Sequence, residues 1–156
     1  MALEIERKYL VDHKKWHELD KPDGKLYRQS YLSTDENKTI RIRLSGSEAY
    51  LTIKGKSTGA TRQEFEYKIP AADAEQMMNS LSESELSKTR YDIHYKGKHW
   101  EVDVFHDAND GLIVAEIELN SEDEQYELPD WVLQEVTDDH KYYNSNLTLK
   151  PFKTWS

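Results

Sequence analysis

The sequence predicts a mainly β protein: an antiparallel sheet curled into a barrel, with a few helices packed outside it. Three observations support this fold class. Many segments alternate charged and apolar residues with a period of two, at which the side chains of a strand share a face. Turn-forming residues join most of these segments over short distances, as in hairpins. Helical spacing occurs only in short stretches, which disfavours a βαβ design.

The strands expected in the first half of the chain are short and follow one another closely. They lie at 3–11, 26–33, 39–45, 49–55 and 63–69. Asp12 is an expected N-cap for a short helix at 13–19. The sequence DKPDGK that follows is typical of a turn, and Ser45-Gly46-Ser47 marks a hairpin.

The second half begins with the longest expected helix and returns to strands. Pro70 stands where a first helical residue is favoured, so we expect a helix at 71–85. Asp138 is a second expected N-cap, for a helix that runs to about residue 147. The strands expected between these two helices lie at 87–96, 99–105, 111–119 and 132–137.

Length and composition limit the class of protein. The 156 residues fit a single domain, at 1–156, and 11% aromatic residues allow a core although only 37% of residues are hydrophobic. We recognise neither a membrane span nor a secretion leader, so we expect a cytoplasmic protein with no membrane partner. The absence of cysteine excludes disulfides and thiolate chemistry. A net charge of −9 argues against nucleic acid as a partner, but it allows a small polyanion in a locally basic pocket.

Seven of the expected strands carry charged residues two positions apart, and each such strand therefore has one charged and one largely apolar face. The charged positions are Glu4, Glu6 and Lys8; Arg41 and Arg43; Lys54 and Lys56; Glu64, Glu66 and Lys68; Lys88, Arg90 and Asp92; Glu101 and Asp103; and Glu116 and Glu118. Periodicity alone does not decide between charges outside an ordinary barrel and charges inside a wide one. Charged faces usually point to water.

The distribution of the two signs of charge makes a binding site as good an explanation as a solvated surface. Acids dominate 101–103 and 116–118, whereas bases dominate 41–43, 54–56 and 88–90. Like charges side by side cost free energy unless an opposite charge lies between them. A phosphate chain would offset crowded Arg and Lys, and a divalent cation would offset crowded carboxylates. With no His or Cys nearby, the carboxylates select hard ions such as Mg²⁺ or Mn²⁺.

An ordered set of short motifs resembles the CYTH superfamily, the triphosphate tunnel metalloenzymes. The first motif is the ExExK pattern at Glu4, Glu6 and Lys8. The others follow in family order: RQSYL at 28–32, RIR at 41–43, LTIKG at 51–55, RQEFE at 62–66, KTRY at 88–91, WEVDVF at 100–105, GLIVAEIEL at 111–119 and QEVT at 134–137. The resemblance covers essentially the whole chain. It implies eight antiparallel strands around a tunnel, with the charged faces inward and the apolar faces packed against helices.

The resemblance also implies roles for individual residues. Those expected to bind phosphate oxygens are Lys8, Arg41, Arg43, Lys54, Lys88 and Arg90. One Mg²⁺ or Mn²⁺ ion is expected at Glu4, Glu6 and Glu118. A second ion, or the attacking water, is expected at Glu64 or Glu66, Asp103 and Glu116. Lys8, Asp103 and Glu116 are the expected catalytic residues, and no single general base is assigned.

The substrate implied for a short bacterial member is inorganic tripolyphosphate, hydrolysed to pyrophosphate and phosphate. The alternatives are a class IV adenylyl cyclase, a thiamine or nucleoside triphosphatase, a non-catalytic polyphosphate-binding module and a β-barrel carrier of small ligands. A homodimer and a monomer are both left open. We expect Lys56, Lys68 and Asp92 to be exposed, and Tyr142 and Tyr143 to pack on the barrel.

Overall fold

The computed structural model describes residues 2–155 as nine strands and three helices, with short 3-10 turns. The strands are β1 (Leu3–Val11), β2 (Lys25–Asp35), β3 (Lys38–Ser45), β4 (Glu48–Gly55), β5 (Thr61–Ile69), β6 (Ser84–Tyr95), β7 (Lys98–Phe105), β8 (Ile113–Glu118) and β9 (Val132–Glu135). The helices are α1 (His13–Glu18), α2 (Ala71–Leu81) and α3 (Asn144–Leu149). No helix in this part of the chain is long and apolar enough to cross a membrane.

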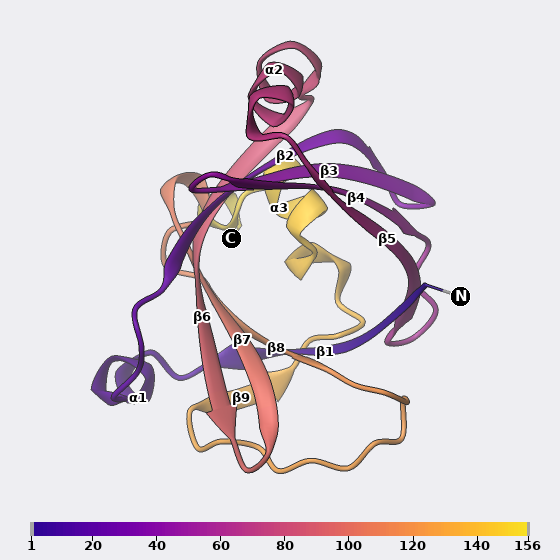
Figure 1. The fold of residues 1–156 in the computed structure, drawn as a ribbon. Helices are drawn as coiled ribbons and strands as arrows, with labels where there is room; N and C mark the ends of the chain where they lie inside the picture. Colours follow the sequence, from indigo (N-terminus) through magenta and orange to yellow (C-terminus); the bar gives the residue numbers. More distant parts are fainter. Residues whose placement is uncertain (1, 156) are drawn as a thin grey trace.

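Eight of the strands close into an antiparallel barrel, which confirms the predicted fold (Figure 1). Their order is β5-β4-β3-β2-β6-β7-β8-β1, and the pairing of β1 with β5 closes the ring. The first half of β1 pairs with β5 and the second half pairs with the short outer strand β9, while β8 lies along its other edge. Strand β1 therefore holds together the two ends of the sheet.

Two predicted helices differ from the observed ones at their ends. Asp12 caps α1 as predicted, because its side chain accepts a hydrogen bond from the Lys15 backbone N–H (3.0 Å). The predicted helix 71–85 was wrong after Leu81, because residue 84 already pairs with β2 as the first residue of β6. The predicted helix 138–147 was also wrong: a 3-10 turn at His140–Tyr142 precedes α3. In the first case strand pairing prevails over local helical spacing.

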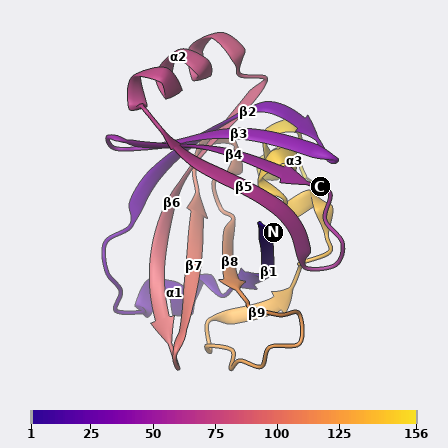
Figure 2. The same ribbon diagram turned by 45° about the vertical axis from the view of Figure 1, so that its right-hand side comes forward.

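The apolar faces of the strands point outward and form two of the three hydrophobic cores. One lies on β1, β6, β7 and β8 around Trp100, which is fully buried, and includes Trp16 of α1 and Trp131 from the segment before β9. The other lies on β3 and β4 and includes Ile42 together with Ala74 and Met78 of α2. Figure 2 shows α2 across this side of the barrel, with α1 and β9 at the opposite side. The helices cover the outer faces because those faces are apolar.

The third core fills one end of the barrel from the inside. Leu86, Phe105 and Val114 share the inward parity of the charged residues on β6, β7 and β8, and they pack against Tyr142 and Leu147 of the C-terminal segment. In Figure 1 this segment, with α3, is seen within the ring of strands. The lumen is therefore apolar and filled at one end, and its charged part is a pocket backed by this core.

Replacing Leu147 with alanine should lower the free energy of unfolding by about 2–5 kcal/mol, because the side chain is fully buried and would leave a cavity. Leu149→Ala is the matched control on the same helix, since Leu149 is 56% exposed and should change stability by less than about 0.5 kcal/mol. Chemical denaturation followed by circular dichroism measures both. Equal losses would contradict the internal position of α3.

Candidate active site

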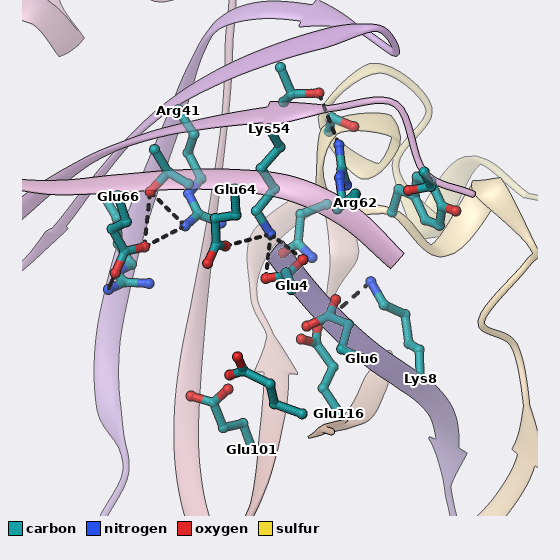
Figure 3. Close-up of a pocket in the computed structure, with 18 of the residues that line it drawn as sticks. Glu4, Glu6, Lys8, Arg41, Lys54, Arg62, Glu64, Glu66, Glu101 and Glu116 are labelled. Carbon is teal, nitrogen blue, oxygen red and sulfur yellow. Dashed lines mark hydrogen bonds and ion pairs between the residues drawn. The ribbon is translucent and has the colours of Figure 1, made fainter. Parts of the chain in front are cut away.

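A cavity of about 230 Å³ lies inside the barrel and is lined by seven carboxylates and seven cationic side chains (Figure 3). The carboxylates are Glu4, Glu6, Glu64, Glu66, Glu101, Glu116 and Glu118. The cations are Lys8, Arg41, Arg43, Lys54, Arg62, Lys88 and Arg90. The charged faces of the strands therefore point inward, and the alternative of a solvated outer surface is excluded.

At the β1–β5 closure, one lysine holds two carboxylates. The Lys54 ammonium of β4 donates hydrogen bonds to both oxygens of Glu4 (3.1 Å each) and lies 3.3 Å from Glu64 Oε2. Burial alone would raise the pKa of Glu4, but the Lys54 charge, the hydrogen bonds with Glu64 and Lys54 and the Arg41 charge together outweigh it and hold that pKa at about 2. Burial, followed by the contact with Glu4, raises the pKa of Glu64 to about 7. One ammonium group therefore faces two carboxylates here, and its positive charge offsets only one of them.

The excess of negative charge is larger where β1 faces β8. Glu6 lies directly opposite Glu118 in the strand register, and Lys8 lies opposite Glu116 with its ammonium 3.7 Å from Glu116 Oε1. Burial, then the Glu116 and Glu4 carboxylates, raise the pKa of Glu6 well above its ordinary value. Partial burial on the pocket rim, then Glu4, also raise the pKa of Glu118. The nearby Lys54 and Lys8 do not outweigh these effects, so the ionised forms of both carboxylates are only partly stabilised by the described residues.

The β3 wall has the opposite imbalance. The Arg41 guanidinium donates through Nη2 to Thr52 Oγ1 (3.1 Å), and this hydroxyl in turn donates to Glu66 Oε2 (3.0 Å). Glu66 is the nearest carboxylate to both Arg41 (3.6 Å) and Arg43 (3.8 Å). Arg41 is only 9% exposed, and its buried Nε has no hydrogen-bond partner among the described residues. The rings of Tyr27 and Tyr50 lie 4.9 Å from the Arg43 guanidinium. Two guanidiniums thus share one carboxylate and keep donors for an anion.

Asp103 lies behind the cavity wall and holds two of its cations. Arg90 of β6 donates through Nε to Oδ1 (2.8 Å) and through Nη2 to Oδ2 (2.9 Å) of this carboxylate. The Lys88 ammonium also donates to Oδ2 (2.7 Å). Asp103 is fully buried and does not line the cavity. Its position therefore fits a role in holding Arg90 and Lys88, in place of the contact with metal or water that we expected.

Burial lowers the pKa of Lys88 to about 8, despite the nearby Asp103. Burial also lowers the pKa of Arg43, and the adjacent Arg41 adds to this effect. In both cases burial in the pocket carries a free-energy cost for the charged form of the side chain. A bound anion would offset it.

The donor set fits a hard divalent cation, although no group of three acidic or histidine side chains within residues 2–155 already forms a metal cage. Glu6 and Glu118 are carboxylates with raised pKa values beside one another, which is the arrangement that a cation stabilises. Mg²⁺ is usually held by one or two carboxylates together with substrate phosphates and waters. A pocket with dispersed carboxylates opposite cations is consistent with that mode of binding.

The cavity includes residues to which the sequence analysis gave no role. Arg62 shares the inward face of β5 with Glu64 and Glu66, so the same period of two predicts it. Tyr27 lines the cavity from β2. Tyr31 of the same strand also lines it; it shares a face with Gln29, and the sequence left open whether the two line the tunnel or have a structural role. The expectation that Tyr142 packs on the barrel is confirmed.

Seven lining residues do not belong to the barrel strands: Ser57, Gly59 and Ala60 between β4 and β5, and Thr137, Tyr143, Asn144 and Ser145 of the C-terminal segment. Tyr143 had been expected to pack on the barrel; its ring instead lies on the cavity wall, 5.4 Å from the Lys8 ammonium. No periodic pattern in the sequence indicates these positions. Lys56, Lys68 and Asp92 are exposed as predicted.

Comparison with known proteins agrees with this geometry. The model of the CYTH domain matches residues 2–149. An inorganic triphosphatase of Acetivibrio thermocellus is 43% identical over 99% of both chains, and one of Nitrosomonas europaea is 35% identical over 94% of this chain and 97% of the relative. A crystal structure of an inorganic triphosphatase superposes with a TM-score of 0.64 at 32% identity, over 96% of each chain.

Asp103→Asn should lower the free energy of unfolding of the ligand-free protein by about 3–5 kcal/mol, because it leaves Arg90 and Lys88 buried without their shared counter-charge. Glu101→Gln is the control: Glu101 also pairs with Arg90 (3.0 Å) but is partly exposed, so the loss should be under about 1 kcal/mol. Urea denaturation at neutral pH compares them. Similar values for both variants would contradict the anchoring role of Asp103.

Proposed function

The chain belongs to the CYTH family, and we propose that it hydrolyses inorganic tripolyphosphate to pyrophosphate and phosphate with the help of divalent metal ions. Two named inorganic triphosphatases align with it over almost its full length, at 43% and 35% identity. A cytoplasmic location and the choice between monomer and homodimer stay predictions.

The observation that carries this proposal is the unequal distribution of charge around one cavity inside the barrel. Arg41 and Arg43 share a single carboxylate on one wall, whereas on another wall Glu6 and Glu118 face each other with no ion-pair partner among residues 2–155. A polyanion together with a divalent cation would offset both imbalances at once. A neutral ligand would offset neither.

The cations bind and orient the phosphate chain. Arg41 and Arg43 offer forked donors that can contact two phosphate oxygens each, and Arg41 Nε is already free to donate. The remaining contacts come from Lys8, Lys54, Lys88 and Arg90. Asp103 keeps Arg90 and Lys88 in place.

The carboxylates hold Mg²⁺ or Mn²⁺, with two ions per site. Glu4, Glu6 and Glu118 would hold the first, and Glu64 or Glu66 with Glu116 would hold the second or orient the attacking water. When bound, such ions neutralise phosphate charge and lower the pKa of a water molecule. Glu116 is suited to this role, since Lys8 and the other nearby cations outweigh its burial and keep its pKa well below the ordinary range.

The reaction is an in-line attack of water on the terminal phosphorus, with pyrophosphate as the leaving group. Phosphoryl transfer depends mainly on positioning and on stabilisation of charge on the phosphate oxygens. The barrel supplies both, because its inward side chains project from paired strands and are held by ion pairs on neighbouring strands.

Product analysis tests the proposal directly. Tripolyphosphate, ATP and thiamine triphosphate are incubated with the protein in Mg²⁺, in Mn²⁺ and in EDTA, and phosphate, pyrophosphate and cyclic AMP are measured. We expect metal-dependent phosphate release, fastest from tripolyphosphate and lost in EDTA. Cyclic AMP and pyrophosphate from ATP would instead make the protein a cyclase, and binding without turnover would make it a polyphosphate-binding module.

Arg41→Ala should reduce kcat/KM for tripolyphosphate at least about thirtyfold, which corresponds to about 2 kcal/mol for a lost charge-assisted phosphate contact. Arg28→Ala is the control, because Arg28 is an exposed arginine of β2 that does not line the cavity. Steady-state kinetics at saturating Mg²⁺ measures both. Near wild-type kcat/KM for Arg41→Ala would refute its assignment to substrate binding.

Glu118→Gln should reduce metal-dependent turnover at least about a hundredfold, because it removes a proposed metal ligand while it keeps the size of the side chain. Circular dichroism should show an unchanged fold, since Glu118 is an exposed residue of the pocket rim. Glu127→Gln, on an exposed loop, is the control. Unchanged activity over a Mg²⁺ titration would remove Glu118 from the metal site.

A further inference from the structure

Lys88 is held at two of its three N–H donors. An ammonium group carries three donors and no acceptor. One goes to Asp103 Oδ2 (2.7 Å) and a second to Asn144 Oδ1 (3.0 Å). Lys88 is only 1% exposed but lines the cavity, so its third donor is the one left for a ligand.

Asn144 contacts Lys88 from the C-terminal segment, which is not one of the barrel strands. It is the first residue of α3, and this short helix is tied down at several points. Leu147 is fully buried in the internal core, and its carbonyl accepts a hydrogen bond from Asn109 Nδ2 (3.3 Å). The hydroxyl groups of Thr148 and Ser84 are hydrogen-bonded to each other (2.7 Å), which joins α3 to β6, the strand that bears Lys88. The carboxamide of Asn144 is therefore held at a defined place relative to Lys88.

We propose that Asn144 is a positioning residue for the phosphoryl-transfer reaction, which aims the third N–H of Lys88 at a phosphate oxygen. This inference rests on the proposed function, because it takes Lys88 as a phosphate ligand. A lysine side chain is flexible, and its ammonium is a point charge without a directional fork. Asp103 and Asn144 together remove that freedom by occupying two of the three donor directions.

The chemical type of residue 144 matters as much as its place. The amide oxygen is a neutral acceptor, so it orients the ammonium without cancelling its charge. Asp103 already supplies the counter-charge and shares it with Arg90. A second carboxylate at position 144 would offset the positive charge that the polyanion needs. An apolar residue would leave the ammonium free to turn toward Asp103 alone.

Steady-state kinetics with tripolyphosphate and Mg²⁺ test this role through three variants. Asn144→Ala should lower kcat at least about tenfold, as expected for loss of a hydrogen bond to a charged group, with KM changed by less than about threefold. Asn144→Asp should instead raise KM at least about tenfold, because it keeps the acceptor and adds negative charge. Asn146→Ala is the control on the same helix, since Asn146 does not line the cavity. It should match wild type.

A double-mutant cycle with Lys88→Met separates positioning from a merely structural effect. If Asn144 acts through Lys88, adding Asn144→Ala to Lys88→Met should lower kcat by less than about twofold further. A purely structural loss would appear in full in both backgrounds and would overturn the inference. Thermal melts of each variant confirm folding. If Asn144→Ala does not fold, the nearly isosteric Asn144→Asp carries the test through its KM.

The two proposals fail in different ways. Wild-type protein that releases no phosphate from tripolyphosphate would overturn the proposed function, and this inference with it. Active wild-type protein with an Asn144→Ala variant that behaves like Asn146→Ala would overturn this inference alone.

Discussion

The structure depends on one electrostatic constraint: a charge inside the barrel needs an opposite charge within a few ångströms. Taking an ion pair out of water is costly, and leaving one partner alone is costlier still. Asp103 shows the constraint at its strictest, since the carboxylate is fully buried and both oxygens are bound by Arg90 and Lys88. Residues 90 and 103 are directly opposite in the β6–β7 register. A slip of one residue in that pairing would move the charged set to the other face of the strand.

The charge of Asp103, behind the cavity wall, is fully compensated, whereas the charges on the wall itself are only partly compensated. This difference supports function. The shifted pKa values of Glu6, Glu64 and Lys88 report groups whose charge is not fully offset by protein neighbours. Perturbed ionisable groups in a cavity are typical of functional sites. Unbalanced acids and unbalanced bases on different walls of the same pocket are what a metal–polyphosphate complex would offset.

A polar lumen is compatible with a stable fold because the apolar faces of the strands are buried on the outside of the barrel. The outer faces of the strands pack under α1, α2 and β9, and Trp100 and Ile42 are fully buried there. One end of the lumen is filled by an internal core around Phe105 and Leu147. Burial of apolar area supplies the main stabilisation in this arrangement. The same internal core places the C-terminal segment, and with it Asn144, against the active site.

The sequence by itself determined which side chains of each strand share a face. The period of two separates charged from apolar faces along each strand, and it assigns Glu4, Glu6 and Lys8 to one face whatever the fold does next. It also predicts Arg62, which shares its face with Glu64. The direction of that face was not a local property, because the same alternation suits a barrel with its charges outside.

The tertiary structure decided the rest, for three physical reasons. The β1–β5 pairing closes the ring and turns the charged faces toward one another. Packing of Leu147 inside the barrel brings a helix with no periodic signal to Lys88. The period of two places Asp103 on the inward face of its strand, but it does not indicate whether the side chain lines the cavity or lies buried behind Arg90. That depends on the cations that surround it. Alternation is set by the backbone of one strand, whereas closure, depth and contacts from the C-terminal segment depend on how distant segments pack.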